Sequence, residues 1–339
     1  MSRRRELLRY LGARLALAPL MLWLIASLVF LLLRVAPGDP IDAILGTRAP
    51  EAARAALRSQ LGLDRPLIEQ YGSFLGHLLR GDLGNSLSNQ EPVTKIIQAS
   101  LPASMELGIV ALLLAAVVGL AVGFSGIARP EGKLDLAGRL YGIGTYALPP
   151  FWAAMVVQLV FAVWLGWLPV GGRFPATLLP PTGSGFYLFD SLRAGSWVQF
   201  SGAVRHLTLP ALTLGILLSG IFTNALRLNL RRALASDYVE AARSRGLSER
   251  RVVLHHALPN ALLPVLTITG ITVASLIGGA LLIEVTYSWP GIAFRLQEAI
   301  AQRDYPLVQG IVVVVAALVV LVTVTVDLLV AMLDPRIRF

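Results

Sequence analysis

The sequence predicts an all-α integral membrane protein with six transmembrane helices. Of its 339 residues, 55% are hydrophobic and only 14% are charged, whereas about 25% of residues are charged in an average soluble domain. The mean hydropathy of +0.69 means that apolar side chains outnumber those that a core of this size can bury, so some of them face lipid. These proportions exclude an ordinary soluble domain.

Uncharged runs of about 20 residues mark the expected spans, because about 20 helical residues cross the hydrocarbon layer of ~30 Å. Helix is preferred to strand because lipid offers no hydrogen-bond partner to open backbone groups. Four of the spans contain proline, which predicts kinks at Pro19, Pro149, Pro150, Pro210 and Pro264. The six spans are 15–33, 107–128, 140–168, 206–226, 257–283 and 306–326.

The charge distribution predicts the orientation of the chain. With the N-terminus inside, the cytoplasmic segments carry 17 basic and 7 acidic residues, and the rest of the chain carries 12 basic and 13 acidic residues. This asymmetry follows the positive-inside rule, so both termini are expected in the cytoplasm. The net charge of +9 therefore reflects topology rather than binding to nucleic acid. The cytoplasmic segments are 1–14, 129–139, 227–256 and 334–339.

The spans divide the chain into three parts. We expect a cytoplasmic N-terminus with the first transmembrane helix (1–34), an outer loop with short helices (35–106) and a transmembrane core of five helices (107–339). The first span is expected to stay as an anchor, because its apolar run is too long for a cleaved signal peptide. The core includes an outer loop (169–205) rich in Gly, Pro and aromatic residues, and a cytoplasmic loop (227–256).

The composition leaves no candidate for catalysis, metal binding or a bound cofactor in this chain. There is no Cys, which excludes disulfides, thiolate nucleophiles and Cys-ligated metal centres. Neither Lys95 nor Lys133 lies in a G-x-x-x-x-G-K-[ST] pattern, so no P-loop is recognisable. The chain by itself is therefore not expected to be an enzyme, and any ATP is held by another chain.

Charged and aromatic residues at the outer ends of the spans are candidates for function, because burying an ionisable group in a membrane is costly. Glu106 begins the second span, and we expect a structural role for it. Glu284 ends the fifth span, and it can line the mouth of a path or pair with Arg295 or Arg303. Trp289 follows closely and is a second candidate for the path or a gate.

The cytoplasmic loop between spans four and five contains the signals of a short helix. Asp237 with Glu240 three residues later predicts a capping box. Ala241 and Ala242 favour helix, and Gly246 predicts a left-handed C-terminal stop.

A second short helix is expected directly after this glycine. Ser248 predicts its cap, Glu249 lies in its first turn and Pro259 follows its end. The loop therefore presents a helix, a glycine break and another helix at the inner face of the membrane.

This pattern resembles the EAA loop of binding-protein-dependent ABC importer permeases. The matching residues are, in order, Glu240, Ala241, Ala242, Gly246, Leu258 and Pro259. The chain departs from the family pattern at His256, where an Ile is usual. Further motifs keep their order along the chain, and with them it is similar to the B-type permease of dipeptide, oligopeptide and nickel importers. These motifs are Pro37-Gly38-Asp39-Pro40, Leu61-Gly62-Leu63-Asp64, Leu209-Pro210-Ala211-Leu212, Trp289-Pro290-Gly291 and Arg303-Asp304-Tyr305-Pro306.

The resemblance implies the fold of a type I ABC importer permease and a coupling role for the loop. In such importers the short helix docks in a groove of the cytoplasmic ATPase and passes nucleotide-driven closure to the spans. The implied coupling residues are Asp237, Glu240, Ala241, Ala242, Gly246, Leu258 and Pro259. Four arginines are candidate ATPase contacts, or alternatively water-facing topology determinants: Arg243, Arg245, Arg250 and Arg251.

The resemblance also implies partners in a bacterial inner (plasma) membrane. These are a similar sister permease in a heterodimer, two cytoplasmic ABC ATPase subunits that hold ATP and Mg²⁺, and an extracellular binding protein. The binding protein is expected to deliver substrate against loops 34–106 and 169–205. Short peptides are the commonest substrates of the family, with nickel, glutathione, oligosaccharides and peptide-like antibiotics as alternatives. Membrane lipid surrounds the complex, and no nucleic acid is involved.

Two other classes of protein remain as alternatives. An ion-gradient-driven secondary carrier or channel would show mid-span charges, or Gly/Pro-broken segments at matching positions of two inverted halves. A membrane receptor or scaffold would use the outer loops and make the inner loop dispensable. The absence of an ionisable residue in the middle of a predicted span favours the importer permease.

Overall fold

The computed structural model describes residues 3–35, 38–46, 49–127 and 132–333, and nearly all of the regular structure in them is helical. The α-helices are α1 (Arg3–Val35), α2 (Pro40–Leu45), α3 (Glu51–Gln60), α4 (Leu67–Leu79), α5 (Val93–Phe124), α6 (Lys133–Ala147), α7 (Pro150–Gln158), α8 (Tyr187–Arg193), α9 (Trp197–Leu234), α10 (Asp237–Ser244), α11 (Glu249–Arg251), α12 (Leu258–Thr286), α13 (Ile292–Ala301) and α14 (Tyr305–Leu333). Two π-helical segments continue neighbouring helices, η1 (Leu159–Trp164) and η2 (Val252–Ala257).

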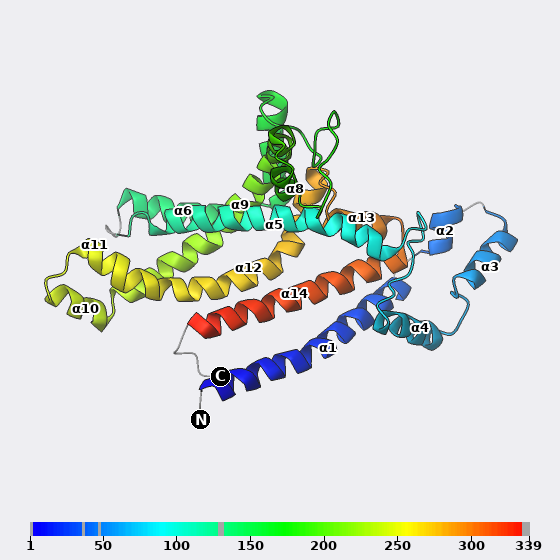
Figure 1. Ribbon diagram of the computed structural model, residues 1–339, viewed down its shortest axis with the longest axis horizontal. Helices are drawn as coiled ribbons and strands as arrows, with labels where there is room; N and C mark the ends of the chain where they lie inside the picture. The colour runs from blue at the N-terminus through cyan, green and yellow to red at the C-terminus, as the bar shows by residue number, and fades with distance from the viewer. Residues whose placement is uncertain (1–2, 36–37, 47–48, 128–131, 334–339) are drawn as a thin grey trace.

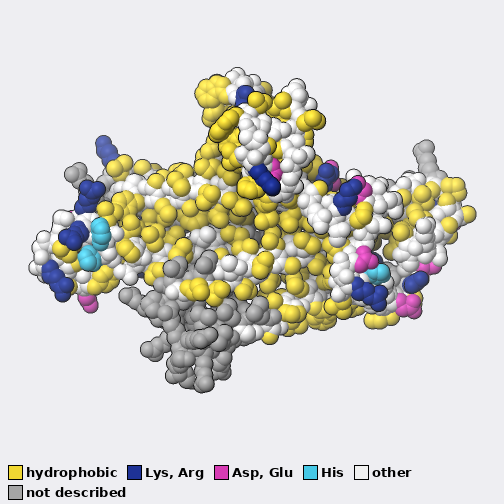
Figure 2. Space-filling model, in the orientation of Figure 1, with side chains coloured by type: hydrophobic (Ala, Val, Ile, Leu, Met, Phe, Trp, Pro, Cys, Tyr) yellow, Lys and Arg dark blue, Asp and Glu magenta, His cyan; other side chains and the backbone are white. Residues whose placement is uncertain are grey.

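The long helices α1, α5, α12 and α14 run along the long axis of the molecule (Figure 1). Helices α10 and α11 lie at one end of this bundle, and α2, α3 and α4 lie at the other. The surface between the two ends is mostly hydrophobic, and charged side chains gather toward both ends (Figure 2). Lys, Arg and His predominate at the end that carries α10 and α11, whereas Asp and Glu lie beside Lys and Arg at the other end. This pattern is typical of a protein whose apolar middle lies in lipid.

Among the described residues, five helices are long and apolar enough to cross a membrane, and a bent pair makes a sixth when it is counted as one span. The bent pair consists of α6 and the helix that runs through α7 and η1, and these halves meet at 101°. Leu148 and Pro149 are extended, and Pro150 begins α7. A proline disfavours helical conformation in the residue before it, which explains why the kink expected here is a complete break.

Several helices extend beyond the uncharged runs that predict the spans. α5 begins at Val93 rather than near 107, and α9 begins at Trp197, inside the expected outer loop 169–205. The added turns contain charged residues such as Lys95 and Arg205. A charge ends a hydrophobic run in the sequence but does not end a helix, because a helix can continue past the hydrocarbon layer.

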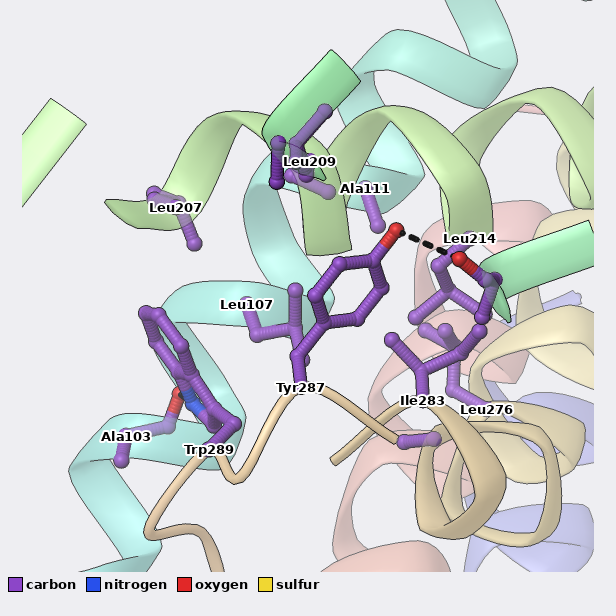
Figure 3. Close-up of a cluster of buried hydrophobic side chains, with 14 residues drawn as sticks. Ala103, Leu107, Ala111, Leu207, Leu209, Leu214, Leu276, Ile283, Tyr287 and Trp289 are labelled. Atoms are coloured by element: carbon purple, nitrogen blue, oxygen red, sulfur yellow. Dashed lines mark hydrogen bonds between the residues drawn. The ribbon is translucent and has the colours of Figure 1, made fainter. Parts of the chain in front are cut away.

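The largest buried aromatic side chains lie where α12 leads into α13. Tyr287 and Trp289 are packed among apolar side chains of α5, α9 and α12 (Figure 3). The Tyr287 hydroxyl lies 3.0 Å from the Thr213 hydroxyl, and the Trp289 indole donates to the Ala103 carbonyl at 3.0 Å. Both polar groups are therefore satisfied inside the core, as buried polar groups require.

One of the short helices in the first outer loop is α4. Its Tyr71 and Phe74 rings pack against Phe30 at the end of α1, with centroid distances of 5.3 and 5.5 Å. The Arg34 guanidinium lies over the Phe30 ring and over the Tyr305 ring of α14. These contacts attach the outer loop to two transmembrane helices.

Candidate functional site

Helix α10 stands at the end of the bundle, between the end of α9 and the start of α11 (Figure 1). Its N-cap residue is Ser236, so Asp237 lies one position inside the helix, and no side chain caps its first amides. The capping box predicted from Asp237 and Glu240 is therefore wrong. The reason is that α9 ends only two residues earlier, and the Ser236 hydroxyl donates to the Ala233 carbonyl of α9 instead. Both carboxylates still lie in the first turn of α10, where the helix dipole favours negative charge.

The α10 helix has a buried face and an exposed face. Val239 and Ala242 are buried in an apolar cluster with Leu230 and Val252. The sequence treats Ala241 and Ala242 alike, but only Ala241 is exposed, because two neighbouring positions on a helix point in different directions. The exposed side chains available to a partner include Asp237, Tyr238, Glu240, Ala241, Arg243 and Arg245.

Gly246 ends α10 as the sequence predicts. Its φ is +77°, in the left-handed region that favours glycine. Its amide bonds the Arg243 carbonyl at 2.9 Å, and the Leu247 amide bonds the Ala242 carbonyl at 3.4 Å. These two bonds form a Schellman motif. A Cβ added at Gly246 would meet no atom within 4 Å, so backbone conformation rather than space requires this glycine.

An ion pair connects α10 to α11. The Arg243 guanidinium donates to both carboxylate oxygens of Glu249, at 2.6 and 3.0 Å, and to the Leu234 carbonyl at 3.4 Å. The hydrogen bond with Glu249 raises the pKa of Arg243. The pair holds the turn around Gly246 closed. Of the four candidate ATPase contacts, Arg243 thus already has a partner within the chain, and Arg245, Arg250 and Arg251 are exposed.

The second helix of the loop does not end before Pro259. α11, the π-helical η2 and α12 form one continuous helical path, and Pro259 lies in the first turn of α12. The expected end before Pro259 is therefore wrong. Pro259 has no backbone N–H and so cannot donate the usual helical hydrogen bond. The wide π-helical turn directly before it tolerates the loss of this bond. Leu258 and Pro259 consequently belong to a helix that enters the membrane region.

The structure places Glu284 and Trp289 inside the protein at the opposite end of α12. The buried Glu284 carboxylate accepts hydrogen bonds from the Ser104 hydroxyl and from the Phe294 amide, the latter at 2.9 Å. Ser104 in turn accepts from the Ile292 amide at 2.7 Å. Glu284 and Ser104 therefore satisfy the first amides of α13, which have no partner within that helix. The alternative pairing with Arg295 is not formed, because Arg295 binds Glu298 at 2.7 Å.

A cavity of about 200 Å³ lies beside this cap, between α5, α12, α13 and α14. Its lining is almost entirely apolar, with Glu284 and Ser104 as polar exceptions. Within the described part of the chain, no group of three or more His, Asp or Glu residues is placed to hold a metal ion.

Two buried ion pairs were not predicted from the sequence. Beside the middle of α5, Arg173 binds Glu106 at 2.7 Å, and both side chains are 6% exposed. At the end near α10, Asp135 binds Arg227, and its side chain is 1% exposed. The positive-inside count treats every charged residue outside the spans as facing water. The only hint in the sequence is that these residues lie next to the apolar runs.

Comparisons with known proteins identify the family. Residues 97–339 match the family described as "Binding-protein-dependent transport system inner membrane component", and residues 7–108 match its N-terminal membrane component. The di/tripeptide transport system permease protein DppB of Pseudomonas aeruginosa is 39% identical over 98% of this chain and 99% of its own length.

Two further dipeptide transport permeases agree with this result. The dipeptide transport system permease proteins DppB of Alkalihalophilus pseudofirmus and Escherichia coli are 37% and 36% identical, over 91% and 93% of this chain and 93% and 94% of their own. A crystal structure of an amino acid ABC transporter with histidines matches at 16% identity and a TM-score of 0.47, over 72% of this chain and 95% of that one.

The family match confirms the predicted fold class, an all-helical membrane protein of the type I importer permease kind, and does not favour an ion-gradient-driven carrier or channel. Permeases of this family act in the inner membrane together with an ATPase and a substrate-binding protein. The chain belongs to the inner membrane components of binding-protein-dependent transport systems, and it is a permease subunit of an ABC importer.

Proposed function

We propose that this chain is the B-type permease of an importer for short peptides. The observation that carries this proposal is the match, over nearly the full length of both chains, to a di/tripeptide transport permease. Matches to two further dipeptide transport permeases support the same substrate class. Nickel complexes remain the second candidate, because the resembled family also includes nickel importers.

The complete importer contains a similar sister permease, two cytoplasmic ATPases and an extracellular binding protein. ATP and Mg²⁺ are held by the ATPases, and this chain contributes no catalytic residue. The end with α10 faces the cytoplasm together with both termini, since Lys, Arg and His predominate on its surface, whereas the other end carries charges of both signs (Figure 2). The binding protein docks against the loops around α2 to α4, at the opposite end, and around α8, beside the middle of the bundle (Figure 1).

Helix α10 is the coupling helix in this proposal. Ala241 is small and exposed, so the backbone of an ATPase groove can approach it closely. The exposed Glu240 accepts a hydrogen bond from the partner. Val239 and Ala242 pack against α9 and η2, so a displacement of α10 moves the ends of two membrane helices. ATP binding then favours the outward-facing state, and hydrolysis restores the inward-facing one.

The remaining coupling residues keep α10 in place. Gly246 sets the turn after α10, and Asp237 lies in its first turn next to the end of α9. Leu258 and Pro259 carry the movement from η2 into α12, because they belong to one continuous helical path.

Uptake in cells tests both parts of the proposal. Labelled dipeptide and tripeptide uptake is measured, alongside nickel uptake, in cells that lack this chain and in cells restored with native protein, Glu240→Lys or Glu240→Gln. Peptide uptake should be lost on deletion, restored by native protein, absent with Glu240→Lys and intermediate with Glu240→Gln. If deletion of the chain abolished nickel uptake and left peptide uptake unchanged, nickel would replace short peptides as the substrate.

Lys133→Glu is the matched control. It also reverses the charge of an exposed residue near this end of the molecule, but it lies on α6 rather than α10. Uptake should remain near the native level in this variant. Equal uptake with native protein and Glu240→Lys, at equal amounts in the membrane, would contradict the coupling role of α10.

A further inference from the structure

We propose that Asp135 and Arg227 form a positioning pair that locks α6 to the end of α9 and so connects α10 to the bent span. This inference rests on the proposed coupling function of α10. It makes α6 move together with α9 when the ATPases displace α10. It also gives a role to Asp135 and Arg227, which the positive-inside count treats only as determinants of orientation.

The pair is buried at the junction of three helices. Asp135 lies in the first turn of α6 and Arg227 lies near the end of α9. One terminal nitrogen of Arg227 donates to the Asp135 carboxylate and to the Asp135 carbonyl, the latter at 2.9 Å. The other terminal nitrogen donates to the carbonyl of Ser125, which ends α5, at 3.2 Å. One guanidinium therefore holds the ends of α5 and α6 against α9.

Two further arginines share the same carboxylate. Arg231 of α9 lies 2.6 Å from one Asp135 oxygen, and Arg139 of α6 lies 3.1 Å from the other. Both are about half exposed, whereas Arg227 is only 5% exposed. Replacing Asp135 by a neutral residue would leave Arg227 buried with no counter-charge from Asp135, which is unfavourable in a low-dielectric environment.

Close packing makes α6 and α9 move together. A Cβ at Gly138 would lie 2.5 Å from the Arg227 guanidinium, so the glycine provides the space that Arg227 occupies. Further along, the Tyr141 hydroxyl lies 2.6 Å from the Ser219 hydroxyl of α9. Small residues let membrane helices approach closely, and hydrogen bonds across them add to the contact. The two helices therefore form one body from the end near α10 to the break at Pro149.

The same body includes the support of α10. Leu230 and Ala233 of α9 lie in the apolar cluster that buries Val239 and Ala242 of α10. A displacement of α10 is thus transferred to the end of α9, then through Arg227 and Asp135 to α6. Beyond α6 the chain turns by 101° into α7 and η1, which present exposed apolar side chains such as Trp152 and Val163.

The experiment uses the complete importer, with the sister permease, ATPases and binding protein, in proteoliposomes. Labelled dipeptide transported per ATP hydrolysed is compared in equal amounts of assembled complex. Asp135→Asn should lower this ratio by about fivefold or more, the lower end of typical coupling factors between sites. A purely stabilising role would lower the yield of complex and leave the ratio unchanged, and that result would overturn the proposal.

Two arginine variants at the end of α9 distinguish the loss of a contact with Asp135 from a general loss of positive charge. Arg231→Ala should lower the ratio by about twofold, since a half-exposed ion pair contributes little free energy, and Arg232→Ala, which removes the neighbouring exposed arginine, should leave it unchanged. If the Asp135→Asn complex does not assemble, the comparison of Arg231→Ala with Arg232→Ala decides the question. Equal transport per ATP in these two variants would reject the positioning role of Asp135 and Arg227.

The coupling role of α10 can fail separately. Glu240→Lys complexes that transport normally would remove the proposed function and this inference with it. Loss of transport in Glu240→Lys together with a native ratio in Asp135→Asn would reject only the positioning pair.

Discussion

The buried ion pair between Glu106 and Arg173 should be a major source of stability where the loop before α8 meets α5. The Arg173 guanidinium donates to Glu106 at 2.7 Å and to the Gly185 carbonyl, and it lies 3.8 Å from the centre of the Tyr187 ring. The second Glu106 oxygen accepts from the Leu188 amide at 2.7 Å. The pair therefore joins the middle of α5 to the loop before α8, which otherwise has little regular structure.

Removing one partner leaves the other charge buried and uncompensated. Glu106→Ala and Arg173→Ala should each lower the free energy of unfolding by about 3–5 kcal/mol. The double variant should cost about 1–3 kcal/mol less than the sum of the two, because no lone charge remains. Arg173→Ala should be the more harmful single change, since it also loses the Gly185 and Tyr187 contacts.

Unfolding in mixed detergent micelles, followed by tryptophan fluorescence, measures these free energies. Trp289 is a suitable reporter because its ring lies 5.8 Å from the Arg173 guanidinium. The exposed pair Glu91 and Lys95, 3.1 Å apart at the start of α5, is the matched control. Each of its alanine variants should cost less than about 1 kcal/mol. Losses below 1 kcal/mol for Glu106→Ala, or strictly additive losses in the double variant, would refute this reasoning.

Three further changes have defined expectations. Gly246→Ala should lower the stability of the α10 turn by about 1–2 kcal/mol, because its φ of +77° is strained for alanine; hydrogen exchange of the Leu247 amide should speed up, and unchanged exchange would contradict the assignment. Trp289→Phe should cost about 0.5–1.5 kcal/mol in unfolding free energy, since the buried hydrogen bond from the indole to the Ala103 carbonyl of α5 is lost; an unchanged unfolding free energy would contradict this. Ser104→Ala should destabilise α13 by a similar amount through the lost bonds to Glu284 and to the first amide of α13, visible as a lower melting temperature, whereas Ser104→Thr should retain most of the stability.

Local signals succeeded where a single residue dominates its own conformation. The break at Pro149 and Pro150 follows from the geometry of proline, and the stop at Gly246 follows from its tolerance of positive φ. The prediction that Asp237 caps α10 was wrong, because the preceding residue, Ser236, occupies the N-cap position. The Ser236 hydroxyl is engaged by the end of α9, and the distance between the two helices was not predictable from the capping pattern alone.

The candidate path residues show a second limit of local reasoning. The sequence left Glu284 with three roles, which were a path lining and pairs with Arg295 or Arg303. Its observed role as the cap of α13, shared with Ser104, requires α5 and α13 to meet beside the end of α12. Residues so far apart in the chain have no spacing that identifies them as neighbours.

The sequence by itself determined the class of the protein, its apolar spans and the helical loop that resembles an EAA motif. These features depend on hydropathy, charge placement and local backbone preference, all of which act over a few residues. Only the tertiary structure decided which alanine of the loop faces outward and which charges are buried, such as Asp135 against Arg227. Burial is a property of helices packed against one another, so it emerges only when segments distant in sequence share a core.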